Sequence, residues 1–301
     1  MSLLCLNEVQ GIPSACQTQN PFTTLKGIVL AVPGFTFDSF TDFANQDKWL
    51  EYIKDKKLFP VMEVKEIEPQ NVEDGFYDTP DGEKLHLYDG QRGYVLKVKY
   101  DLNLHKILRT YSGKNWTIFK IDKANNVMAQ TPDGTTVGGF ELSLFHVDKQ
   151  DNNISADTPA YTMMTIQEAI VNEWDVNGLY ITPTWLALKL DGVTKVVLTA
   201  STISSNAFTL TALYTDNAHL TSAGASNTAA LTGRVAADFE IIDQTGAILN
   251  PATAYTCTEQ SANPGTYDID ATVGAMTSGS ASVKPSATNL YESDSVTVVA
   301  P

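Results

Sequence analysis

Histidines, the side chains most often used as metal ligands or catalytic bases, are few and scattered in this 301-residue chain. A metal site usually brings them to matched spacing, such as three or four residues apart on one helix face. The four histidines are His86, His105, His146 and His219, and none has that spacing to another. His86 and His146 lie inside alternating strand patterns. We therefore predict ordinary surface or packing roles for all four.

Paired carboxylates offer a second possible chemistry. Glu66 with Glu68, and Asp268 with Asp270, are two residues apart, so each pair would share one face of a strand. Such pairs could hold a cation or, at another spacing, hydrolyse a glycoside, but we favour a solvated strand face or turn. Residues 148–153 are polar like a calcium loop, yet they lack its glycine and terminal glutamate.

Larger catalytic motifs are missing from the sequence. We find no Gly-x-Ser-x-Gly elbow, no P-loop and no dinucleotide-binding glycine fingerprint. The three cysteines, Cys5, Cys16 and Cys257, have no Cys-x-x-Cys spacing; Cys5 and Cys16 could pair, but a reduced protein is the simpler expectation. The sequence thus predicts no catalytic, cofactor-binding or metal-binding residues, no cofactor and no enzymatic activity.

Aromatic side chains are concentrated in the first half of the chain. They could form a platform that stacks on carbohydrate, or they could pack a β-rich core and its interfaces. The residues concerned are Trp49, Tyr52, Tyr77, Tyr88, Tyr100, Tyr111 and Trp116.

The net charge of −15 opposes binding to nucleic acid, because contact with phosphates needs clustered Lys and Arg. We expect no sequence-specific nucleic-acid binding, although an acidic surface could face DNA without adhering to it. No window approaches the roughly 18 consecutive apolar residues of a membrane span, and the first residues lack a signal-peptide core, so we expect no membrane partner.

The elements expected before residue 191 are mainly strands. Alternating or branched apolar runs predict strands at 26–32, 61–67, 93–100, 116–121, 140–147, 179–182 and 185–190. A helix is expected near 39–57, capped by Asp38 or Thr41, and a second at 165–174, where Glu168 follows Thr165 at capping-box spacing.

The composition changes near residue 190. Residues 191–301 hold 3 Lys and Arg and 10 Asp and Glu, against 17 and 25 in residues 1–190, and they are rich in Ser, Thr, Ala and Val. We expect an extended arm at 1–25, a β-rich assembly domain at 26–213, a linker at 214–232 and an Ig-like β-sandwich at 233–301. Residues 193–213 could belong to the assembly domain, as these bounds have it, or bridge to the second domain. The predicted fold is mainly β: an antiparallel sandwich or barrel body with one or two helices, plus the C-terminal sandwich.

Two parts of the sequence resemble structural proteins of tailed bacteriophages. Asp238-Phe-Glu-Ile-Ile-Asp-Gln-Thr-Gly246, with residues 263–269, is similar to Ig-like folds appended to phage tail and capsid proteins. Residues 116–126 and 139–148 are similar to structural proteins of phages that infect Bacteroidetes.

The resemblance implies a non-enzymatic virion protein that is assembled in the host cytoplasm, as a tail-tube or neck component. Its partners would be further copies of itself in a ring or tube, and other virion proteins. A capsid accessory or decoration protein, or a surface glycan-binding β-sandwich protein, are the alternatives.

Overall fold

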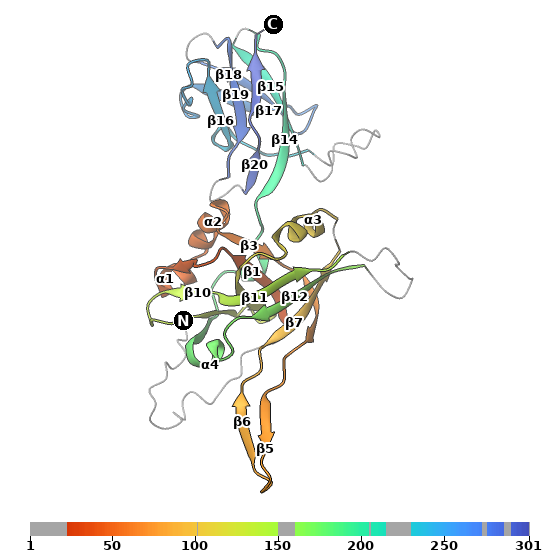
Figure 1. Cartoon of the computed structure of the whole chain (residues 1–301). Helices are drawn as coiled ribbons and strands as arrows, with labels where there is room; N and C mark the ends of the chain where they lie inside the picture. The colour runs from red at the N-terminus through yellow and green to blue at the C-terminus, as the bar shows by residue number, and fades with distance from the viewer. Residues whose placement is uncertain are drawn as a thin grey trace. The chain divides into compact units, whose positions relative to one another are not determined.

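The computed structural model describes residues 23–100, 102–149, 160–204, 206–214, 230–272, 276–285 and 290–300. The chain divides into two compact units, Met1–Asp191 and Gly192–Pro301. We treat each unit by itself (Figure 1). The expected arm at 1–25 falls almost entirely outside the described residues, as do Cys5, Cys16 and His219.

Most elements of the first unit are strands, which confirms the predicted β class. In chain order the described elements are β1 Leu25–Ala31, β2 Thr36–Phe37, α1 Phe40–Ala44, α2 Gln46–Lys54, β3 Leu58–Val61, β4 Val64–Pro69, β5 Gly75–Asp78, β6 Lys84–Tyr88, β7 Gly93–Lys99, α3 Leu102–Tyr111, β8 Thr117–Asp122, β9 Val127–Gln130, β10 Val137–Gly138, β11 Phe140–Val147, β12 Tyr161–Glu168, α4 Glu173–Asn177, β13 Gly178–Ile181 and the short 3-10 helix η2 Ala187–Lys189.

Within the described residues, eleven of these strands form one antiparallel sheet. Its main path runs β2-β10-β9-β8-β11-β12-β7-β4, with β1 joining β8 to β3 and β13 pairing with β9. The central strands are branched and apolar, and β1 buries Ile28 and Leu30 against Ile118 of β8 and Phe140 of β11. This buried face is the main core of the unit.

The helix expected near 39–57 is instead two short helices. Asn45 is extended (φ −92°, ψ 119°) and ends α1 while its side chain caps α2, accepting a hydrogen bond from the Asp47 amide at 3.0 Å. Ser39, rather than Asp38 or Thr41, caps α1. Both helices bury aromatic side chains, and the Trp49 indole donates to the Phe43 carbonyl at 2.7 Å.

The helix predicted at 165–174 is wrong. Residues 161–168 form β12, which pairs with β7 from Tyr161 to Gln167 and buries alternate side chains, such as Met164 and Ile166. Pairing on both sides outweighs the local capping signal, and the helix α4 begins only at Glu173. The sequence also contains a helix that we did not predict, α3, in which Leu104 and Leu108 pack on the core.

The strand predicted at 185–190 is also wrong, because an asparagine side chain takes up its backbone groups. Asn125 donates to the carbonyls of Pro183 and Trp185 and accepts from the Ala187 amide at 2.8 Å. These contacts replace strand pairing and hold the segment in a turn that leads into η2. The expected strand at 61–67 is divided between β3 and β4 at Glu63, whose φ is 61°.

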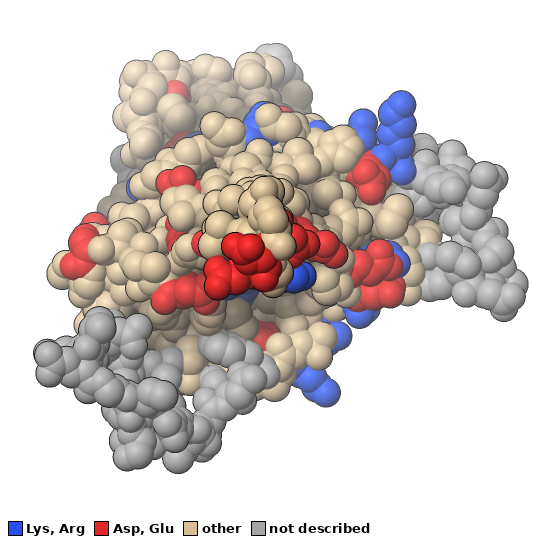
Figure 2. All heavy atoms as spheres, turned by 60° about the horizontal axis from the view of Figure 1, so that its bottom comes forward, with Lys and Arg blue, Asp and Glu red and all other residues tan. Residues whose placement is uncertain are grey.

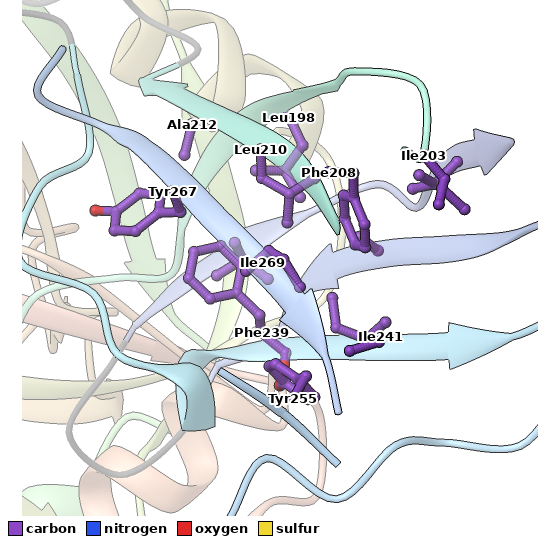
Figure 3. Packing of buried hydrophobic residues seen from close by; sticks show 14 of the residues in the cluster. Leu198, Ile203, Phe208, Leu210, Ala212, Phe239, Ile241, Tyr255, Tyr267 and Ile269 are labelled. Carbon is purple, nitrogen blue, oxygen red and sulfur yellow. The ribbon is translucent and has the colours of Figure 1, made fainter. Parts of the chain in front are cut away.

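The second unit is a two-sheet β-sandwich. Its described elements are β14 Thr194–Ala200, β15 Ala207–Tyr214, η5 Ala236–Asp238, β16 Phe239–Asp243, β17 Tyr255–Glu259, β18 Thr266–Ala271, β19 Ser278–Val283, β20 Tyr291–Ser293 and β21 Val296–Val299. One sheet has the order β17-β18-β15-β14-β20 and the other β16-β19-β21. In Figure 3, side chains of β15 and β18, such as Leu210 and Ile269, approach Phe239 and Ile241 of β16 to form one core.

The boundary between the units lies after Asp191, which corrects the expected end of the first domain at residue 213. Strand β15 pairs with β18, placing Phe208 opposite Ile269, and β14 pairs with β20, so both strands belong to the sandwich core. The expected linker at 214–232 therefore connects two elements of the second unit, and most of it falls outside the described residues.

Candidate assembly surface

The most unusual surface of the first unit is formed by residues 63–92, which we call the acidic ribbon. Its base is β4, at the end of the sheet path, paired with β7; the chain then continues into the β5–β6 hairpin. In Figure 1 this hairpin projects away from the body of its unit. The turn at its tip is Thr79-Pro-Asp-Gly82, in which Gly82 has φ 85°.

Large apolar side chains cover the hairpin although it has no core beneath it. Leu85 and Leu87 are 50% and 62% exposed, and Phe76, Tyr77 and Tyr88 are each more than half exposed. An isolated two-stranded hairpin is marginally stable in water, and proteins that stay monomeric seldom expose such a patch. The hairpin therefore has the composition of a surface that another molecule covers.

The two faces of the hairpin both contribute apolar groups. Phe76 lies opposite His86, with their ring centroids 5.4 Å apart, while Tyr77 lies opposite Leu85 on the other face. A side chain at Gly75 would collide with the Tyr88 ring, so glycine leaves room for this ring beside the strand. A partner could contact either face.

Polar contacts fix where the hairpin leaves the sheet. The Gly90 amide donates to Asp74 at 2.7 Å, and the Gly93 amide donates to Asn71 at 3.1 Å. Further backbone bonds join Gln70 to Gly93 and Val72 to Gln91. This continuous pairing connects the hairpin to β4 and β7 rather than leaving it on a single-stranded tether.

The ribbon is strongly acidic. Residues 63–92 contain nine Asp and Glu and three Lys and Arg. Figure 2, turned so that the hairpin comes toward the reader, shows acidic side chains gathered on this face. At the base, Lys97 of β7 contacts both Glu66 and Glu68, so this predicted carboxylate pair binds a lysine. Charged side chains along β4 also discourage uncontrolled pairing of a sheet edge.

The first unit contains a buried ion pair between Lys120 and Glu168. The Lys120 ammonium contacts the Glu168 carboxylate and lies 4.8 Å from the centre of the Phe140 ring. Burial, and then the negative charge of Glu168, hold the pKa of Tyr94 well above its usual range. Glu168 is only 1% exposed, so its carboxylate presents no surface to a substrate. We assign this pair a structural role, linking β8 to β12.

Glu173, at the start of α4, is a second buried carboxyl. It is 2% exposed, and its Oε2 accepts a hydrogen bond from the Glu141 amide at 3.2 Å. Its Oε1 has no hydrogen-bond partner among the residues that the structure describes. Burial raises the pKa of Glu173 to about 7. No sequence motif points to Glu173, because its burial depends on how α4 packs.

Three of the four histidines, His86, His105 and His146, lie among the described residues. His105 is buried beside the Thr162 hydroxyl, and burial lowers its pKa. His146 contacts Ser112 and Asp148, and His86 contacts Asp89 at 3.0 Å on the hairpin. Across the described ranges, no three or more His, Cys, Asp or Glu side chains gather as they would around a metal ion.

The aromatic residues of the sequence analysis do not form one platform. Trp49 and Trp116 are buried, and Tyr111 packs against Phe59 and Trp116. Of those seven aromatic residues, Tyr77 and Tyr88 are exposed, and both lie on the hairpin. In the second unit, Asp268 and Asp270 lie on the outward face of β18, and Asp268 accepts from Gln260 at 2.6 Å.

Cys257 is a free, half-buried thiol of β17, and burial raises its pKa to about 12. Its thiolate is thus disfavoured, which makes it a poor nucleophile.

No helix in the described part of the chain is long and apolar enough to cross a membrane.

Comparison with known proteins adds no family to this geometry. No protein-family model matches the chain, and no curated protein matches it.

Proposed function

We propose that this chain is a non-enzymatic structural protein that self-assembles into a ring or tube in a phage virion, as a tail-tube or neck component. The observation that carries the assembly part is the projecting β5–β6 hairpin with apolar side chains exposed on both faces. The virion part rests on the sequence resemblance of residues 116–126, 139–148 and 238–246.

Assembly would remove the main physical liability of the hairpin. Covering its exposed Leu, Phe and Tyr side chains gains roughly 25 cal/mol for each Å² of apolar surface removed from water. A neighbouring copy would supply this cover at every position of a repeating structure. A net charge of −15 on each copy would let the acidic surfaces of a tube face DNA without holding it.

Two alternatives share part of this support. A capsid accessory or decoration protein would use the same hairpin to bind a different virion protein instead of its own copies. A glycan-binding protein would use the exposed rings of Tyr77 and Tyr88. Self-assembly by the purified protein separates our proposal from both, because neither alternative requires it.

The test compares two pairs of exposed apolar residues by sedimentation velocity. Leu85→Thr with Leu87→Thr removes apolar surface from the hairpin but keeps strand propensity. Val235→Thr with Ile248→Thr is the matched control, since these residues are 60% and 65% exposed in the second unit. We expect the hairpin variant to lose the large species of the wild type and the control to keep it. Equal assembly of both variants would contradict a role for the hairpin.

A further inference from the structure

The first unit carries a compact basic patch in addition to its acidic ribbon. The basic patch comprises Lys54, Lys56, Lys57 and Lys114, around the end of α2, the start of β3 and the end of α3. Lys56, Lys57 and Lys114 are exposed. The acidic residues beside the patch are Asp55, within the run from Lys54 to Lys57, and Glu51, which pairs with Lys48 at 2.9 Å and also feels the charges of Lys54 and Lys57. The patch is thus positive in a chain that is strongly negative as a whole.

Two of the four lysines, Lys57 and Lys114, lie over tyrosine rings. The Lys57 ammonium is 5.2 Å from the centre of the Tyr52 ring, and that of Lys114 is 5.8 Å from the centre of the Tyr111 ring. Lys56 lies close enough to Tyr111 for its charge to oppose the rise that burial causes in the pKa of that tyrosine. Phe59 of β3 connects the lysines that follow α2 to Tyr111 at the end of α3, because its ring centroid is 5.2 Å from that of Tyr111.

Ribbon and patch are complementary in two respects. The ribbon presents carboxylates beside exposed Phe, Tyr and Leu side chains, and the patch presents ammonium groups beside aromatic rings. Opposite charges at an interface fix its register and speed association, while apolar burial supplies most of the affinity. The two surfaces also belong to the same compact unit, so every copy carries both.

The placement of the hairpin and the basic patch prevents the two surfaces of one copy from contacting each other. In Figure 1 the hairpin points away from the body of the first unit, whereas α2 and α3 lie at the other end of that unit. A contact between two different surfaces of identical chains is heterologous and repeats from copy to copy, closing into a ring or extending as a filament.

We infer that the β5–β6 hairpin of one copy docks on the basic patch of a second copy, in a head-to-tail contact. The inference rests on the proposed self-assembly and names the two surfaces that would meet. A nucleic acid is the weaker candidate for the patch, since four lysines beside Glu51 and Asp55 offer few phosphate contacts and the net charge of −15 repels DNA.

The test is charge reversal on each surface. The patch variant carries Lys54→Glu, Lys57→Glu and Lys114→Glu. The ribbon variant carries Glu73→Lys, Asp81→Lys and Glu83→Lys, which spares Asp74 and its bond to Gly90. A control variant carries Lys123→Glu, Lys149→Glu and Lys189→Glu, three exposed lysines outside the patch. Circular dichroism confirms that each variant is folded.

We expect the patch variant and the ribbon variant each to need at least ten times more protein than the wild type or control to form large species. Mixing the two variants should restore assembly, because each reversed surface then meets its complement. Combining both reversals in one chain should restore it too.

Three results would overturn the inference, and they differ from one another. Wild-type assembly that neither reversal weakens would refute the docking and leave the proposed function standing. Absence of wild-type assembly would refute both. Loss of duplex-DNA retention in the patch variant, with assembly intact, would assign the patch to an anionic polymer instead.

Discussion

At the scale of single residues, Glu173 has the most informative environment. Its carboxyl is buried, with Glu141 and Glu168 as charged neighbours, and burial raises its pKa to about 7. In an unfolded chain the same group titrates near 4.5. The folded state therefore holds a proton that the unfolded state releases between these pH values, so the contribution of Glu173 to the stability of the first unit falls as pH rises from about 4.5 to 7.

This difference predicts the effect of Glu173→Gln, which keeps the shape and cannot ionise. We expect the variant to be more stable than the wild type by about 1–3 kcal/mol at pH 8, and nearly equal to it at pH 4. All four tryptophans of the chain lie before Asp191, so denaturation followed by tryptophan fluorescence reports the first unit selectively. The exposed Glu83→Gln serves as control. A stability difference that does not change with pH would contradict the assignment.

At the scale of elements, the break at Asn45 defines how α1 and α2 pack. This residue ends one helix and caps the next, and the two helices bury Phe43 and Trp49 against each other. Asn45→Ala removes the cap and should cost about 1 kcal/mol of stability. The neighbouring Gln46→Ala should change stability little. Unaltered tryptophan-detected unfolding in Asn45→Ala would show that packing alone holds the helices.

Strands with clear alternation could be predicted from the sequence, whereas elements decided by distant partners could not. Residues 93–100, 116–121 and 140–147 coincide closely with β7, β8 and β11 because their own apolar pattern matches their burial. Residues 165–168 have a capping pattern, yet pairing with β7 makes them a strand. Residues 185–190 alternate, yet Asn125 holds them as a turn from sixty residues earlier in the chain.

The candidate surface was only partly visible in the sequence. The Thr79-Pro-Asp-Gly82 turn, with aromatic and Leu residues on both sides, indicates a hairpin. Whether that hairpin packs on a core or projects from it depends on the rest of the sheet. The exposure of its apolar side chains therefore becomes evident only in the structure. Helix α3 had a usable signal, since Leu104, Leu108 and Tyr111 recur at four and three residues.

At the scale of the whole molecule, the division after Asp191 predicts that the second unit folds independently. Its two sheets share one core that includes Leu210, Ile269, Ile241 and Val298. A fragment of residues 192–301 should unfold cooperatively with a β-type circular dichroism spectrum. A fragment that is soluble but shows no cooperative transition would mean that the sandwich depends on the first unit.

The same division places both proposed contact surfaces in the first unit, so the second should be dispensable for assembly. Residues 1–191 alone should form the same large species as the full chain, because they hold both the acidic ribbon and the basic patch. Sedimentation velocity at matched molar concentration makes the comparison. A fragment that folds, as judged by its tryptophan fluorescence, but stays monomeric would assign the interface to the sandwich.

Negative-stain electron microscopy of the purified full-length protein, at physiological salt and across a concentration series, tests the central claim most directly. A self-assembling structural protein should give rings or tubes of uniform diameter, whose number falls when Leu85 and Leu87 of the hairpin are replaced by Thr. Particles that remain single 32.7 kDa chains at every concentration would contradict the account.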